Sequence, residues 1–247
     1  MSMSYRFTTR VDSRDVDGSG FCRPSAVLGY LQEAATAAAE ELGVGREKTL
    51  GQYGAVWILA RVWYRLDRPL RWGETVEIHT WHRGGKGASM YRDFDLYAGG
   101  EPVGEAVSVW ALARLSDHKL LRVGDVSSLV DSDGGPLCKS IQLTRLRLPQ
   151  EMETAERRLM HYSDTDLNGH VNNNRYADFA CDAIHAETLP QGTYVASLQI
   201  GYTAECRAGE TITMLTAAQG ERRMVHGVDE AGKSRFDAVL ILGQDVP

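Results

Sequence analysis

Two stretches of the chain place apolar side chains at the three- and four-residue spacing of a helix. The first covers residues 23–42, where Pro24 suits the first helical turn. The second begins near residue 172, directly after a cluster of polar residues. Both patterns predict helices that bury one face. The apolar positions are Val27, Leu31, Ala34, Ala35, Ala38 and Leu42 in the first stretch, and Tyr176, Phe179, Ala180, Ala183 and Ile184 in the second.

Strand-like segments of alternating or continuous apolar character follow each helical pattern. Each half of the chain is therefore expected to form a strand, one long helix and about four antiparallel strands, which defines an α+β fold. The segments are residues 68–81, 89–98 and 106–115 in the first half, and 209–218, 223–230 and 236–243 in the second.

The two halves also repeat one another in sequence. Residues 15–20, DVDGSG, and residues 164–169, DTDLNG, share three of six positions at an offset of 149. Residues 68–81 and 204–217 share a Gly-Glu-Thr at an offset of 136. We interpret the chain as two copies of one unit. The alternative is chance similarity between two α+β halves.

The segment between the halves contains the turn-forming run Asp-Ser-Asp-Gly-Gly-Pro at residues 131–136. Charged residues near 150–158 are interpreted as solvated. We place the boundary between residues 140 and 150, so the predicted domains are residues 1–140 and 141–247.

The differences between the copies point to chemistry in the second half. It carries Asp166, Asn168, His170 and Glu205, and only the first of these has an identical counterpart. A carboxylate and an imidazole together can activate water. The corresponding residues of the first half are, in the same order, Asp17, Ser19, Phe21 and Pro69.

The spacing Asp-x-Asn-x-His predicts convergence if the segment is extended, because alternate side chains then share one side. Gly169 permits a turn, and a helix start near 172–174 would offer backbone N–H groups to an oxyanion. The alternative is that these polar residues only form turns and helix caps. We favour that interpretation for Asp164 and for Asn172, Asn173 and Asn174.

Charge and composition make several classes of partner and cofactor unexpected. The chain has a net charge of -6 and lacks a basic stripe, so nucleic acid is not an expected partner. The sequence holds neither an apolar run of membrane-spanning length nor a signal peptide pattern, so we expect no membrane association and a cytoplasmic location. Its four cysteines, Cys22, Cys138, Cys181 and Cys206, are too scattered for a disulfide framework or a zinc site. A metal site built from His161, Asp164, Asp166 and His170 matches no established ligand motif.

The polar cluster resembles the acyl-acyl-carrier-protein thioesterases of plants and bacteria. Their pattern, Asp-x-Asn-x-His-Val-Asn-Asn followed by Tyr, is matched from Asp166 to Tyr176, and their Glu-Cys pair by Glu205 and Cys206. Residues 31–35, 71–81 and 107–115 are also similar to the family. The sequence lacks the transit peptide and hydrophobic anchor of plant members, which favours a bacterial-type soluble enzyme.

The resemblance implies a tandem, or double, hotdog fold, with two long helices each wrapped by an antiparallel sheet. The first hotdog would bind the acyl chain and the second would be catalytic. The family's catalytic set falls on Asp166, Asn168, His170 and Glu205, with no cofactor or metal expected. Substrate contacts are expected from Val171, Asn172, Cys206 and Trp57, and Cys206 is interpreted as a supporting residue rather than a nucleophile.

The implied reaction is hydrolysis of fatty acyl-acyl carrier protein to free fatty acid. Apolar residues of the first half would wall the acyl chain, and the acidic carrier protein would be the partner. A homodimer is expected, because an exposed hotdog sheet edge invites pairing. The alternatives are an acyl-CoA thioesterase, a non-catalytic acyl-thioester-binding protein, and a hotdog hydratase or dehydratase. The expected wall residues are Trp57, Ile58, Leu59, Trp63, Met90 and Trp110, and the candidate docking residues are Arg145, Arg147, Arg157 and Arg158.

Overall fold

The computed structural model describes residues 4–126, 139 and 141–245 and divides them into two compact units. Of the described residues, the first unit comprises 4–11, 29–64, 73–126, 139 and 141–143, and the second comprises 12–28, 65–72 and 144–245. Segments 12–28 and 65–72 thus group with the second half of the chain. Cys138 and the turn-rich run 131–136 lie outside the described residues.

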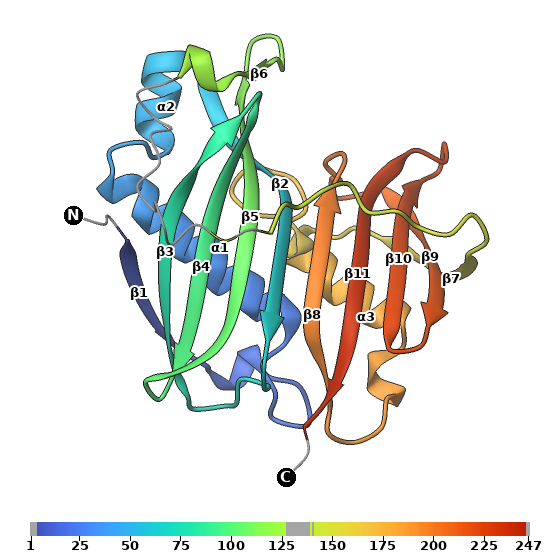
Figure 1. Ribbon diagram of the computed structural model, residues 1–247. Coiled ribbons are helices and arrows are strands. Elements are labelled where there is room, and N and C mark those ends of the chain that lie inside the picture. The colour runs from blue at the N-terminus through green and yellow to red at the C-terminus, as the bar shows by residue number, and fades with distance from the viewer. Residues whose placement is uncertain (1–3, 127–138, 140, 246–247) are drawn as a thin grey trace. The chain divides into compact units, whose positions relative to one another are not determined.

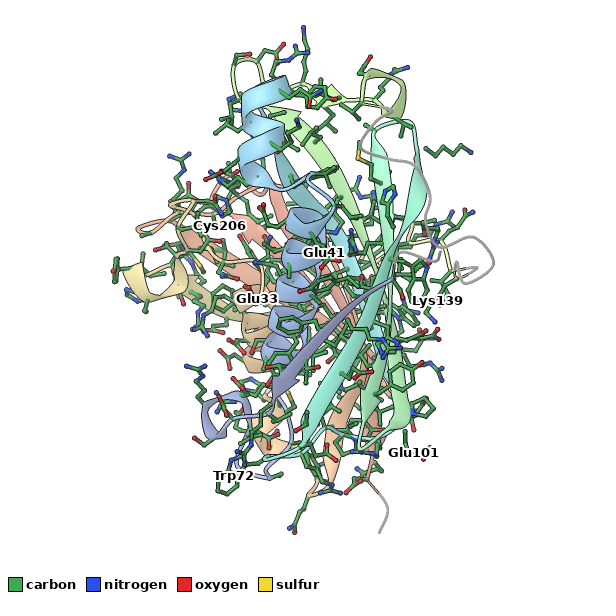
Figure 2. The ribbon with its side chains drawn as sticks, turned by 90° about the vertical axis from the view of Figure 1, so that its left-hand side faces the viewer. Glu33, Glu41, Trp72, Glu101, Lys139 and Cys206 are labelled. Atoms are coloured by element: carbon green, nitrogen blue, oxygen red, sulfur yellow. The ribbon has the colours of Figure 1, made fainter. Side chains whose placement is uncertain are left out.

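The first unit is an antiparallel sheet with the strand order β1-β3-β4-β5-β2, and β6 pairs with β5. Helix α1, whose residues from Gly29 onward belong to this unit, runs along one face of the sheet (Figures 1 and 2). The elements are β1 (Tyr5–Arg10), α1 (Pro24–Glu41), α2 (Arg46–Tyr53), β2 (Ala55–Leu66), β3 (Thr75–Lys86), β4 (Ser89–Ala98), β5 (Glu101–Arg114) and β6 (Leu120–Leu121).

Helix α1 confirms the first helical prediction. Its stripe of Leu31, Ala34, Ala35 and Ala38 is at most 4% exposed, as expected for the face that packs on a sheet. Glu33 and Glu41 lie on its solvent-exposed side (Figure 2).

The second unit has the strand order β8-β11-β10-β9-β7, again antiparallel. Helix α3 contacts β9 and β11, and the Tyr176 ring lies 5.0 Å from the Phe236 ring between centroids. The elements are β7 (Glu153–Leu159), α3 (Arg175–Ala183), β8 (Thr193–Tyr202), β9 (Thr211–Gln219), β10 (Arg222–Asp229) and β11 (Ser234–Gln244).

Two details of the second unit differ from the sequence prediction. Helix α3 has nine residues rather than the length of α1, because the chain leaves it at Ile184 and enters the left-handed region at His185, with φ 53°. The charged stretch near 150–158 is not a plain linker, since most of it forms the edge strand β7. An edge strand tolerates charge because one side of it faces water.

The repeat predicted from sequence is confirmed in the backbone. Asp17 N–H donates to Phe21 O at 2.9 Å, and Asp166 N–H donates to His170 O at 3.0 Å. Cys22 N–H donates to Leu70 O and Val171 N–H to Cys206 O, both at 2.7 Å. These pairs reproduce both offsets, 149 and 136, which excludes chance similarity. We call residues 166–170 the second-half turn and residues 17–21 the first-half turn.

Candidate active site

The second-half turn is a closed loop rather than an extended segment. Gly169 N–H donates to Asp166 O at 3.0 Å, and Gly169 adopts φ 77°, which favours glycine. The convergence predicted from an extended chain is therefore wrong in its premise. The turn itself keeps the three polar residues together, with Asn168 exposed at its tip and Asp166 and His170 partly buried.

The Asp166 carboxylate stabilises this turn. Its Oδ1 accepts the Asn168 N–H at 2.8 Å, and Asp17 Oδ1 accepts the Ser19 N–H at the same distance in the first-half turn. An aspartate that closes a turn by accepting an N–H two residues on is a common arrangement. Because the first half has this bond without the His or the Glu, the geometry assigns Asp166 a structural task shared by both copies.

His170 and Glu205 are the groups that the structure sets face to face. His170 Nδ1 lies 3.2 Å from Val171 O, and a carbonyl only accepts, so Nδ1 carries the proton. In the neutral ring Nε2 is then the basic nitrogen, and it lies 3.9 Å from Glu205 Oε1. The His170 side chain is 20% exposed and that of Glu205 is 56% exposed, so the pair is open to water.

Cys206 supports the site from behind. It is fully buried, its carbonyl holds Val171, and its thiol bonds to the hydroxyl of Tyr176. Burial raises the pKa of the Cys206 thiol, against the opposing effects of Tyr176 and Arg235, so the thiolate is disfavoured at neutral pH. Val171 is also buried, at 1% exposure. Substrate contact by either residue stays a prediction.

The oxyanion donors expected at the helix start near residues 172–174 are only partly available. The Val171 N–H is held by Cys206, and the Asn172 N–H donates to Asp164 O at 2.9 Å. The Asn174 N–H is taken by Asn172 Oδ1 at 2.9 Å. Within the described residues, the N–H groups of His170 and Asn173 donate no hydrogen bond. In the first half, by contrast, the Phe21 N–H donates to Asp17 Oδ1 at 3.1 Å.

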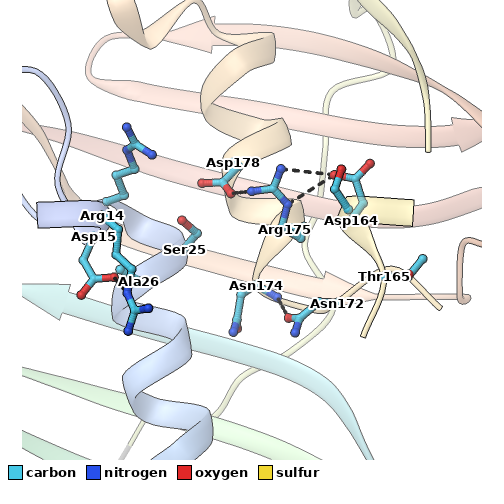
Figure 3. A pocket seen from close by; sticks show the side chains of 12 residues that line it. Arg14, Asp15, Ser25, Ala26, Asp164, Thr165, Asn172, Asn174, Arg175 and Asp178 are labelled. Atoms are coloured by element: carbon cyan, nitrogen blue, oxygen red, sulfur yellow. Dashed lines mark hydrogen bonds and ion pairs between the residues drawn. The ribbon is translucent and has the colours of Figure 1, made fainter. Parts of the chain in front are cut away.

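A polar cavity of about 330 Å³ adjoins the start of α3 (Figure 3). Its centre is Arg175, which bonds to Asp164 Oδ1 at 3.2 Å and to Asp178. Burial would raise the pKa of Asp164, but the His161 N–H and Arg175 outweigh it and hold that pKa below its ordinary value. Sequence reasoning assigned no task to Arg175, although its i,i+3 spacing from Asp178 is a typical helix ion pair.

Trp57 lies in the core of the first unit. Its Nε1 donates to Val44 O at 2.9 Å, and its ring packs on a cluster that includes Met90 and Leu112. Trp63 packs instead on a second cluster that contains Val107 and Val109. The two tryptophans expected to wall the acyl chain therefore belong to different clusters, and Trp57 as a substrate contact stays a prediction.

Two arginines considered for carrier docking are engaged inside the second unit. Arg157 pairs with Glu230 at 3.3 Å. Arg158 pairs with Asp182 at 2.8 Å and its guanidinium lies 4.4 Å from the centroid of the Phe179 ring. Arg145 lines a cavity of about 420 Å³ beneath residues 144–152, which cross the outer face of the sheet in front of β8 and β11 (Figure 1).

Two family models match consecutive parts of the chain. Residues 2–127 match the model of the acyl-ACP thioesterase N-terminal domain, and residues 149–238 match that of the C-terminal domain. The chain belongs to the acyl-ACP thioesterase family.

Curated relatives come from plants. The chain is 25% identical over 226 residues to a chloroplastic acyl-[acyl-carrier-protein] hydrolase of Cuphea viscosissima, which covers 86% of this chain and 55% of the relative. It is 23% identical over 243 residues to the chloroplastic dodecanoyl-[acyl-carrier-protein] hydrolase of Cinnamomum camphora, covering 92% and 61%. The chain thus spans a little over half the length of these relatives.

Solved structures confirm the double hotdog fold. An acyl-ACP thioesterase from Bacteroides thetaiotaomicron matches with a TM-score of 0.84 at 21% identity, covering 98% of each chain. The 12:0-ACP thioesterase from Umbellularia californica matches with a TM-score of 0.78 at 20% identity, covering 99% of each chain.

Proposed function

We propose that this chain hydrolyses the thioester of fatty acyl-acyl carrier protein to a free fatty acid and the carrier thiol. The observation that carries the proposal is the pairing of His170 Nε2 with Glu205 beside one of two otherwise matching turns. The turn can form without this His–Glu pair, because the first half forms the matching turn with Phe21 and Pro69 at the corresponding positions. Family membership supports the same reaction.

In the proposed mechanism a water molecule hydrogen-bonds to both His170 Nε2 and Glu205. The water oxygen attacks the thioester carbonyl carbon while Nε2 takes its proton, and Glu205 stabilises the imidazolium that forms. The N–H groups of His170 and Asn173 are the available donors for the oxyanion. Collapse of the tetrahedral intermediate breaks the C–S bond, and the imidazolium returns its proton to the leaving thiolate.

Asp166 and Asn168 are positioning residues in this scheme. The Asp166 carboxylate fixes the turn that presents His170. Asn168, at the tip of the turn, would orient the imidazole or the substrate. We assign the catalytic task to the second unit and the binding of the acyl chain, with Trp57, to the first.

The first prediction concerns thiol release from acyl-carrier protein. We expect Glu205→Gln and His170→Ala to lower kcat by about 10²–10⁴-fold, since positioned acid–base groups contribute that much. A thiol-reactive dye would follow the release. Asp166→Asn is compared with Asp17→Asn, which weakens the matching turn in the half without His170 and so reports the purely structural loss.

Three results would contradict the proposal or redirect it. Binding of acyl thioester without thiol release would indicate a non-catalytic binding protein. Equal hydrolysis of acyl-CoA would widen the substrate class beyond the carrier protein. Conversion of 2-enoyl or 3-hydroxyacyl thioesters without thiol release would indicate a hydratase or dehydratase.

The setting of the enzyme is part of the proposal. Among the described residues no helix is both long and apolar enough to cross a membrane. We infer a cytoplasmic enzyme that acts without nucleic acid or membrane as a partner, and that associates as a homodimer.

A further inference from the structure

Two large apolar side chains are almost completely exposed to solvent beside the second-half turn. Tyr162 is 90% exposed and Leu167 is 86% exposed. Tyr162 opens the short 3-10 helix that precedes the turn, and Leu167 lies between Asp166 and Asn168 within it. Exposed aromatic and aliphatic groups next to reactive ones mark a binding surface when the fold does not need them.

The first half shows that the fold does not need them. At the same offset of 149, Ser13 stands for Tyr162 and Gly18 stands for Leu167. The first-half turn nevertheless has the same backbone–backbone hydrogen bonds, and its 3-10 helix begins with the same capping arrangement. Tyr162 and Leu167 are therefore present only in the copy that holds His170 and Glu205. The first-half turn has instead Trp72, which is 66% exposed, donates its N–H to Gly20 O and is replaced by Ala208 in the second half.

An arginine stands at the same place beside both turns, but its ion pairing differs between the copies. Arg71, in the first half, lies 5.1 Å from the centroid of the Phe21 ring and is ion-paired with Asp245. Its counterpart at the offset of 136 is Arg207, two residues after Glu205. Arg207 is exposed, and among the described residues its guanidinium has no ion pair. Its charge is thus available to an external partner.

We propose that Tyr162, Leu167 and Arg207 form the surface on which the acyl carrier protein docks, and we call these three residues the docking surface. The inference rests on the proposed function, because the carrier is the source of the thioester. An acidic protein complements the unpaired Arg207, and aromatic and aliphatic side chains supply contact area at its centre. Side chains this exposed cannot enclose an acyl chain, which favours a protein surface as the occupant.

The test compares two substrates that carry the same acyl group. Acyl-carrier protein presents the thioester on a protein, whereas acyl-pantetheine presents it on an uncharged arm alone. The variants are Tyr162→Ser with Leu167→Gly, which copy the first half, and Arg207→Ala. The control is Leu115→Ser, which removes a leucine of the first unit that is 51% exposed.

We expect each docking variant to lower kcat/KM for acyl-carrier protein by about tenfold or more, chiefly through KM. Hydrolysis of acyl-pantetheine should stay within about twofold of wild type, and Leu115→Ser should change neither substrate. Added salt should lower the kcat/KM of the wild type for acyl-carrier protein toward that of Arg207→Ala, because salt screens exposed charge pairs. Isothermal titration with apo-carrier protein measures the docking without any turnover.

Several outcomes would overturn the docking surface. Equal losses on both substrates would place the residues in contact with the arm or the reacting groups. No loss on the carrier substrate, or unchanged binding of apo-carrier protein, would exclude docking here. A change of oligomeric state in the variants would identify the patch as a contact between chains. If wild type hydrolyses neither substrate the proposed function fails, and the titration alone then decides the docking.

Discussion

At the scale of single residues, the tautomer of His170 decides what the site can do. A carbonyl at Nδ1 leaves Nε2 as the basic atom, and that atom faces a carboxylate across 3.9 Å. The distance exceeds a direct hydrogen bond, so a bridging water is the natural occupant of the gap. In the proposed mechanism this arrangement lets the imidazole act as the general base.

Cys206 gives a prediction at the same scale. Because burial raises the pKa of its thiol, the residue is protonated at neutral pH and serves as packing. We expect Cys206→Ala to keep kcat within about threefold of wild type while destabilising the fold by about 1–2 kcal/mol through the lost buried volume. Thiol release and chemical denaturation would measure the two effects. Loss of turnover by orders of magnitude, with the fold intact, would restore the thiol as a nucleophile.

At the scale of elements, the start of α3 depends on the Asp164–Arg175 pair. The Asp164 side chain is 3% exposed and accepts from both the His161 N–H and Arg175. Its carboxylate therefore ties the segment before the turn to the first residue of the helix. Removing the Asp164–Arg175 pair should therefore destabilise the turn that positions His170.

The pH dependence of stability follows from the lowered pKa of Asp164. A depressed pKa in the folded state stabilises the fold above the ordinary value of 3.8, and this contribution is lost as the pH falls through the folded value. We expect Asp164→Asn to lower the free energy of unfolding by about 1–3 kcal/mol at pH 7. The difference from wild type should shrink below about pH 4.

The matched control is Asp15→Asn in the first half. Asp15 accepts the Asp12 N–H at 3.0 Å, as Asp164 accepts the His161 N–H. Asp15 forms an ion pair with the exposed Arg14 at 3.9 Å, and Ala26 stands where the second half has Arg175. Its loss should be smaller than that of Asp164→Asn. Equal losses in urea titrations would show that Arg175 contributes little to the tie.

Elements also show where sequence reasoning succeeds and where it stops. The repeat offsets fixed which residues correspond, and they brought Glu205 to the turn that holds His170 before any coordinates were known. Propensity could not show that α3 ends at Ile184 or that β7 is an edge strand, because tertiary contacts decide both. The sequence could not show that the Asn172 and Asn174 N–H groups already have acceptors, because such partners are set by the folded chain.

At the scale of the whole molecule, the sheet orders leave β1 and β7 at the ends of their sheets. β7 carries Glu153, Glu156, Arg157 and Arg158, and such charge discourages pairing with another strand. β1 carries two arginines in six residues, with Tyr5, Phe7 and Thr9 alternating between them. We therefore assign the expected pairing of chains to β1.

A homodimer through β1 is the prediction at this scale. Sedimentation equilibrium of the full chain should give twice the mass of one chain at micromolar concentration. The N–H groups of the odd-numbered residues of β1 face β3, in step with the Val11 N–H that donates to Glu74 O. Thr8→Pro therefore removes a backbone N–H from the free edge of β1 and should shift the equilibrium toward the monomer. A wild-type monomer at every concentration would contradict the prediction, and Leu159→Pro in β7 is the matched control.

The duplicated turn has a consequence for symmetry. In a dimer of two identical half-length chains every surface occurs twice, so a substitution at one turn necessarily appears at the other. With both copies on one chain, Phe21 and His170 can diverge independently, and so can Gly18 and Leu167. Two copies on one chain can therefore take different tasks, whereas two identical single-repeat chains in a symmetric dimer cannot. Each chain would then carry one His170–Glu205 pair, so a titration of active sites should count one site per polypeptide.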